Sequence, residues 1–97
     1  MRTLEQIKSI LRQHNGILAE KYGVAIVGVF GSYVRGDEEP GSDLDVLAEV
    51  LRPISLLEFV GAEIYLSEKV GVKVDLIPRR DVREELRAAV HAETVTL

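Results

Sequence analysis

Five residues have the types and spacing needed for chemistry on a phosphate. Gly31 and Ser32 are followed after ten residues by Asp43 and Asp45, and a third acid, Asp75, stands between apolar residues further on. A Gly-Ser turn between a buried strand and a helix presents N–H groups and a hydroxyl to a phosphate, because glycine permits close backbone approach and the helix dipole favours an anion. The two acids have Cα atoms about 6.6 Å apart on one face of a strand, so their carboxylates can converge on a shared Mg²⁺. If Asp75 lies on the neighbouring strand, it completes a second metal position or takes the proton of an attacking hydroxyl, which indicates phosphoryl-type transfer.

These residues must be positioned by helices and strands, and the hydrophobic periodicity of the sequence predicts such elements. Val24 to Phe30 is β-branched and apolar on both faces, as expected of a central strand covered on two sides. The polar segment that follows predicts a loop with one short helical turn after Ser32. The expected helices are 4–22, 56–69 and 82–92, and the expected strands are 24–30, 43–50, 72–77 and a short edge strand within 94–97.

Capping residues set the expected helix ends. Thr3 with Gln6, and Ser55 with Glu58, fit capping boxes, and Asp81 is the expected N-cap of the last helix. Gly16 is a point where the first helix could weaken or break. The apolar residues of the second long helix predict its core face, and these are Leu56, Leu57, Val60, Ile64 and Phe59.

Length and composition limit the class of protein. Ninety-seven residues predict a single domain spanning 1–97. The net charge of −4 disfavours direct binding of nucleic acid, since no diffuse positive field is present. The chain has no Cys, so it has neither disulfides nor a thiolate metal site. Its first residues lack the apolar core of a signal peptide and no apolar run approaches a membrane span, so we expect a cytoplasmic protein without membrane contact.

The segments Val29-Phe30-Gly31-Ser32-Tyr33-Val34-Arg35-Gly36 and Ser42-Asp43-Leu44-Asp45-Val46 resemble the signature of the DNA polymerase β nucleotidyltransferase superfamily. Asp75, within Val-Lys-Val-Asp-Leu-Ile, matches the third acidic position of that signature. Length and element order resemble the minimal nucleotidyltransferases over essentially the whole chain. The resemblance implies an α+β minimal nucleotidyltransferase fold, with a small mixed sheet of three or four strands and flanking helices.

The resemblance also implies a role for each motif residue. Gly31 and Ser32 would hold the β and γ phosphates of ATP, assisted by Arg35. Asp43 and Asp45 would bind one or two Mg²⁺ ions, with Asp75 as a third ligand that also orients or deprotonates the acceptor hydroxyl. Two departures could lower activity: Val34 stands where the family often has Ala, and residues 37–39 add negative charge beside the phosphates.

Minimal nucleotidyltransferases are commonly antitoxins paired with an all-helical HEPN ribonuclease toxin. The resemblance therefore implies a hetero-oligomer in which AMP is transferred from ATP to a toxin tyrosine. The chain is not the toxin half, because only three residues separate Arg87 from His91, shorter than the toxin motif. Two alternatives stay open: an antitoxin that masks its partner without catalysis, and the catalytic subunit of a two-chain enzyme acting on a small molecule.

Other polar residues have simpler explanations. Arg35 is equally consistent with a phosphate ligand and with a solvated loop charge. His14 and His91 lack a matching acid–base partner, so neither is expected to be catalytic. The remaining feature is a basic stripe on an acidic protein that is either solvated or faces an acidic partner or a nucleotide phosphate, and it consists of Arg79, Arg80, Arg83 and Arg87.

Overall fold

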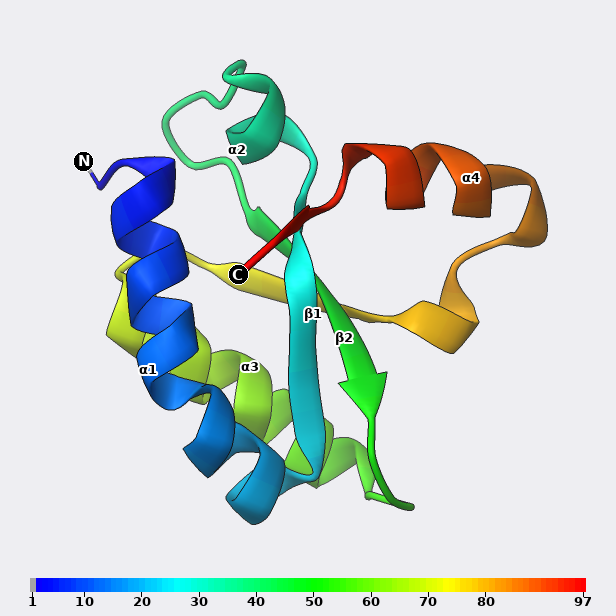
Figure 1. Cartoon of the computed structure of the whole chain (residues 1–97). Coiled ribbons are helices and arrows are strands. Elements are labelled where there is room, and N and C mark those ends of the chain that lie inside the picture. The colour runs from blue at the N-terminus through cyan, green and yellow to red at the C-terminus, as the bar shows by residue number, and fades with distance from the viewer. Residues whose placement is uncertain (1) are drawn as a thin grey trace.

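Four strands form one mixed sheet in a computed structural model that describes residues 2–97 (Figure 1). The strands are β1 (Val24–Phe30), β2 (Leu44–Val50), β3 (Val74–Pro78) and β4 (Val95–Thr96). Their order is β3-β2-β1-β4, with β1 antiparallel to both β2 and β4, and β2 parallel to β3. The helices are α1 (Leu4–Tyr22), α2 (Ser32–Arg35), α3 (Leu56–Val70) and α4 (Glu84–Glu93), and a 3₁₀ turn (Arg79–Asp81) links β3 to α4. The expected α+β fold with a small mixed sheet is confirmed.

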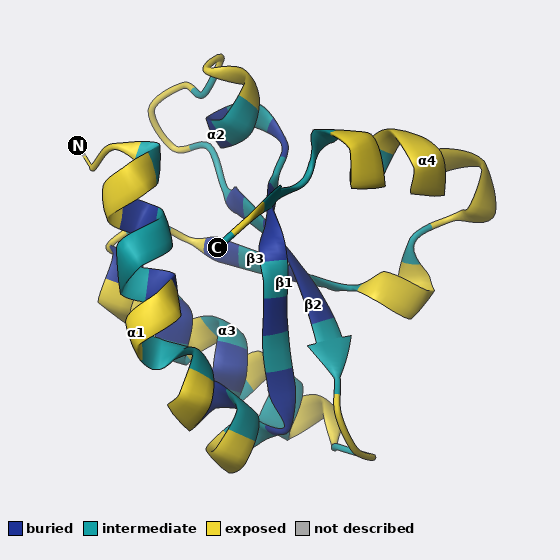
Figure 2. Ribbon diagram, viewed as in Figure 1, coloured by how far each residue is buried: buried dark blue, intermediate teal, exposed yellow. Residues whose placement is uncertain are grey.

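Helices α1 and α3 lie side by side on one face of the sheet, and the core lies between them and the strands (Figure 1). Figure 2 shows buried positions along the strands and the inward helix faces, whereas α4 has no buried residue. On β2, alternate residues Leu44, Val46 and Ala48 are fully buried in this core. Because side chains alternate along a strand, Asp45 and Glu49 belong to the opposite face, which α1 and α3 leave open.

Local sequence explains how the helices begin and end. The Thr3 hydroxyl accepts from the backbone N–H of Gln6 while the Gln6 side chain accepts from the N–H of Thr3, so the first expected capping box is confirmed. The box at Ser55 and Glu58 is confirmed in the same way. Gly16 does not break α1, which runs unbroken for 19 residues. No helix within residues 2–97 has the length and apolarity that a membrane crossing requires.

Three expected boundaries were wrong. The last helix is capped by Arg83 without a side-chain hydrogen bond, because Asp81 belongs to the 3₁₀ turn that precedes it. Strand β3 begins at Val74 rather than at residue 72 and includes Pro78, which an edge strand tolerates. Strand β2 begins at Leu44, so Asp43 lies one residue before it.

The expected core face of α3 was also wrong. Leu56, Leu57 and Ile64 are 79%, 82% and 54% exposed, and Val60 is exposed as well. The buried residues of α3 are Ala62, Leu66 and Val70, with Phe59 and Tyr65 packed partly against them. This helix carries apolar residues on two faces, and periodicity alone does not show which of them meets the sheet.

We predict that Leu66→Ala destabilises the fold far more than Leu57→Ala. The Leu66 side chain is fully buried, so its truncation leaves a cavity and lowers the free energy of unfolding by about 2–5 kcal/mol. Leu57 is mostly exposed, so its truncation changes that free energy by about 0.5 kcal/mol or less. Urea unfolding of both variants measures the difference, and equal losses would contradict the observed orientation of α3.

Candidate active site

The two halves of the Gly-Ser and Asp-x-Asp motif meet at one end of the sheet. Gly31 follows β1 with φ of +84°, and a Cβ built on it would overlap the carboxylate of Asp45. Phe30 at the end of β1 pairs with Asp45 in the antiparallel β1–β2 ladder. Only glycine combines this backbone conformation with such a close approach. The Gly-Ser turn and the second acid of the Asp-x-Asp motif are therefore adjacent in the fold.

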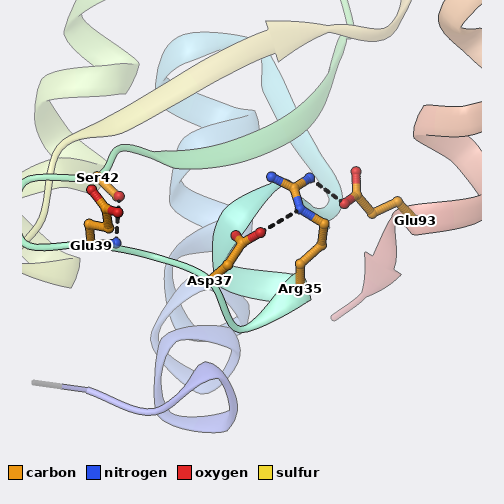
Figure 3. Close-up of polar contacts among 5 residues, drawn as sticks. All are labelled: Arg35, Asp37, Glu39, Ser42 and Glu93. Atoms are coloured by element: carbon orange, nitrogen blue, oxygen red, sulfur yellow. Dashed lines mark hydrogen bonds and ion pairs between the residues drawn. The ribbon is translucent and has the colours of Figure 1, made fainter.

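The ten residues between Ser32 and Asp43 form a loop that is held by its own hydrogen bonds. The N–H groups of Val34 and Arg35 donate to the carbonyl of Gly31, which forms the single turn of α2. At the far end, Ser42 Oγ accepts from the N–H of Glu39 at 2.8 Å, and the Ser42 N–H donates to the Glu39 carbonyl at 2.9 Å (Figure 3). The Tyr33 side chain, from the α2 turn, is buried. The spacing of the motif is therefore built into local structure.

The third acid lies next to the second. Strands β2 and β3 run parallel in a register that pairs Asp45 with Asp75, so both side chains belong to the face of the sheet away from α1 and α3, which they share with the fully buried Leu47. Asp75 thus lies on the neighbouring strand, as the sequence analysis required. Asp43 precedes β2 and forms a 3.6 Å ion pair with Lys73, the residue before β3. Lys73 is mostly exposed, so this pair is readily exchanged for another cation.

Electrostatic crowding is strongest at Asp45. Its pKa is raised above the usual value, first because burial penalises the charged carboxylate and then because Asp75 and Asp43 repel it. Arg35 opposes this shift, and Glu93 adds to it. The carboxylates are therefore close enough to interact, and the site favours either a proton or a cation at Asp45.

Arg35 is held between two carboxylates from different parts of the chain. Its Nε donates to Asp37 Oδ2 at 3.2 Å, and its Nη1 donates to Glu93 Oε1 at 2.6 Å (Figure 3). The hydrogen bond to Glu93 is the main reason why the pKa of Arg35 is raised. About half of the Arg35 side chain is exposed. Because a guanidinium carries five N–H donors, Arg35 can keep both partners and still donate to a phosphate.

Sequence reasoning did not find Glu93. This residue ends α4 and lies 58 positions from Arg35, so no local motif connects the two. The only signal was an acidic residue immediately before an expected edge strand. By pairing with β1, β4 brings the end of α4 to the motif, and that pairing is a property of the fold.

Comparison with known proteins decides the family. A family model described as "Nucleotidyltransferase domain" matches residues 11–96 of the chain. The chain belongs to the nucleotidyltransferase domain family. It is therefore a nucleotidyltransferase, as the motif predicted.

Relatives match this nucleotidyltransferase over nearly its whole length. It is 42% identical over 95 residues to the protein adenylyltransferase MntA of Thermococcus cleftensis, covering 98% of this chain and 96% of the relative. It is 48% identical over 82 residues, 84% of each chain, to MJ1217 of Methanocaldococcus jannaschii, which is named as a candidate protein adenylyltransferase. A solved structure of a candidate minimal nucleotidyltransferase superposes with a TM-score of 0.80 at 30% identity, covering 99% of this chain and 97% of that one. The minimal nucleotidyltransferase fold is confirmed.

The donor chemistry of the nucleotidyltransferase site fits Mg²⁺. Within residues 2–97, no three or more His, Asp or Glu side chains stand close enough together to enclose a metal ion. Mg²⁺ does not require such an enclosure, because it usually takes one or two carboxylates together with substrate phosphates and water. Burial and then repulsion by neighbouring acids raise the pKa of Asp45, which borders the Gly31 turn, so a cation bound there would relieve that repulsion. Asp43 and Asp45 are accordingly the residues that would hold it.

We predict that Gly31→Ala impairs this nucleotidyltransferase much more than Gly41→Ala. Both glycines have positive φ, so alanine introduces backbone strain of about 1–2 kcal/mol at either position. At Gly31 the added methyl group must also displace the Asp45 carboxylate, whereas at Gly41 nothing lies within 4 Å. We expect kcat/KM for nucleotidyl transfer to fall about 100-fold in Gly31→Ala and by no more than a few fold in Gly41→Ala. Similar kcat/KM values for the two variants in steady-state assays would contradict the close approach of Gly31 to the Asp45 carboxylate.

We predict that Asp45→Asn stabilises the ligand-free protein at neutral pH. The folded state raises the pKa of Asp45, so the ionised carboxylate disfavours folding and the penalty is largest above the folded pKa. As pH falls through that pKa, the native carboxyl takes up a proton and the penalty disappears. Thermal melts should show a higher Tm for Asp45→Asn at pH 7 and convergence with the wild type under acidic conditions. A lower Tm for the variant at pH 7 would contradict the conclusion that burial and the neighbouring acids destabilise the ionised Asp45.

Proposed function

We propose that the chain is a protein adenylyltransferase that transfers AMP from Mg·ATP to a tyrosine of a HEPN ribonuclease toxin, and so acts as an antitoxin. The observation that carries this proposal is the contact of Gly31 with Asp45, together with the register that pairs Asp45 with Asp75. The Gly31 turn and two acids thus lie at one end of the sheet. The name of the Thermococcus relative supports a protein acceptor. Toxin–antitoxin complexes, including one with AMP-PNP, share the fold at 17–20% identity.

In this proposal each residue acts at a defined atom. Gly31 and Ser32 bind the β and γ phosphates through backbone N–H groups and the Ser32 hydroxyl, and Arg35 donates to the same oxygens. Bound at Asp43 and Asp45, Mg²⁺ would neutralise charge that develops on the triphosphate. The acceptor hydroxyl oxygen forms a bond to the α phosphorus, and the bond from that phosphorus to the oxygen bridging to the β phosphate breaks. Pyrophosphate leaves with the bonding electrons, and Asp75 accepts the hydroxyl proton.

We predict that Asp43→Asn and Asp45→Asn each reduce AMP transfer at least about 100-fold, because each removes a negative charge aimed at the metal and phosphates. The assay is intact-mass spectrometry of the purified toxin partner after incubation with the protein, Mg²⁺ and ATP. The wild type should add one or more AMP groups to the toxin, and peptide mapping should place them on tyrosine. Gly41→Ala serves as the matched control in the same loop.

The same assay separates the alternatives. Complete toxin neutralisation by the Asp43→Asn, Asp45→Asn double variant, without any mass increase, would show masking and overturn the catalytic proposal. Transfer of AMP to a small hydroxyl compound but not to the toxin would instead identify the catalytic subunit of a two-chain enzyme. Loss of neutralisation by the double variant with complex formation intact is the result that we expect.

A further inference from the structure

A groove beside Asp75 joins the candidate active site to the exposed apolar face of α3. Its volume is about 540 Å³, and it lies between α3, the outer edge of β3 and the 3₁₀ turn. Leu56, Phe59, Val60 and Leu76 contribute apolar lining, and Asp75 lines the same groove. A molecule seated in it therefore contacts the apolar face of α3 and the edge of β3 at Asp75, whose side chain belongs to the sheet face on the other side of that edge.

Leu56, Leu57, Val60 and Ile64 form one exposed apolar surface along α3. The spacing 56, 60 and 64 places three of these residues in a single row along the helix. Large apolar side chains gathered on one face are a common mark of a protein interaction site. The groove takes two members of this row, Leu56 and Val60, so surface and groove form one continuous feature.

The edge of β3 restricts what can occupy the groove. The outward N–H of Val74 donates to Ser67 Oγ at 2.9 Å, and the outward N–H of Leu76 donates to Glu63 Oε2 at 2.9 Å. The next outward position is Pro78, which has no N–H. Every outward donor of this edge is therefore used or missing, so an added β-strand would find no N–H partners. The groove instead suits side chains from the face of a helix.

Charge distinguishes the two sides of the groove. Arg80, Val50 and Pro78 also line a second cavity of about 360 Å³. That cavity adds Arg79, Arg87 and His91, so with Arg80 it contains three members of the basic stripe seen in the sequence. Arg79 is paired with Glu49 at 3.5 Å, whereas Arg80 and Arg87 make no ion pair within residues 2–97. Three acids, Glu63, Asp75 and Asp81, line the rest of the groove, and Glu63 accepts from the N–H of Leu76. Acidic side chains of an occupant would therefore match only the arginine end of the groove, at Arg80 and the arginines of the neighbouring cavity.

We propose that this groove is the docking site for the acceptor protein. Its occupant is an amphipathic helix that lays apolar residues along α3 and acidic residues against Arg80. The inference rests on the proposed function, because it is Asp75 as acceptor of the hydroxyl proton that makes the occupant the AMP acceptor rather than a second copy of the chain. Docking here brings the acceptor to the β3 side of the carboxylates, while Gly31 lies at the end of β1, beyond β2.

The test uses the full chain and the purified HEPN toxin partner, with Leu56→Asp and Arg80→Glu as separate variants. Both residues are exposed, and an acid at Leu56 suits the first turn of a helix, so both variants should fold. We expect each to weaken toxin binding by about tenfold or more in calorimetry and to lower kcat/KM for AMP transfer in parallel. Stabilisation of the protein by Mg·ATP in thermal melts should stay at the wild-type level. Ile17→Asp, at an exposed apolar residue of α1, is the matched control and should leave binding unchanged.

The outcomes separate this inference from the proposed function. A wild-type protein that binds the toxin but transfers no AMP would overturn the proposed function. Normal transfer by the wild type, with unchanged toxin affinity in Leu56→Asp and Arg80→Glu, would overturn the docking site alone. Sedimentation of the protein without toxin gives a third result: a dimer that Leu56→Asp converts to a monomer would assign the α3 face to a second copy and overturn the inference.

Discussion

The contact between the Gly31 backbone and the Asp45 carboxylate is the constraint on which the site depends. It joins the end of β1 to the start of β2 across a connection of thirteen residues, and it leaves no room for a side chain at position 31. The α2 turn, the buried Tyr33 and the reciprocal hydrogen bonds between Glu39 and Ser42 hold that loop in place. The Gly31 turn and the Asp45 carboxylate are therefore positioned by one another rather than by separate parts of the fold.

This arrangement is electrostatically unfavourable without ligands. Asp45 is partly buried beside Asp75 and Asp43, and Arg35, the positive charge that opposes their repulsion, is already shared by Asp37 and Glu93. Interactions of this kind reduce the stability of the ligand-free protein, and a cation bound beside Asp45 would relieve the repulsion. The hydrophobic core under the sheet, built by α1, α3 and the inward residues of the strands, supplies the stability that the acids oppose.

Residue spacing predicted much of this protein because its signals are local. Capping boxes at Thr3 and Ser55, the β-branched run of β1 and the Gly-Ser spacing each act within a few residues or one loop. The failures involve tertiary context. Periodicity identified apolar rows on α3 but not the row that the sheet would cover, and nothing near Glu93 in the sequence points to Arg35. Asp81 has the chemistry of an N-cap, but the chain enters a 3₁₀ turn there and α4 begins later.

Strand β2 serves the core and the site through alternate residues. Leu44, Val46 and Ala48 fill the core, while Asp45 belongs to the face that carries the acids. A shift of one residue along this strand would turn the acid inward and the leucine outward. The register of β2 therefore fixes the core residues and the position of Asp45 at the same time. Insertions and deletions in this fold are tolerated in exposed loops. Between Leu44 and Ala48, however, a single insertion or deletion would disrupt the core and the site together.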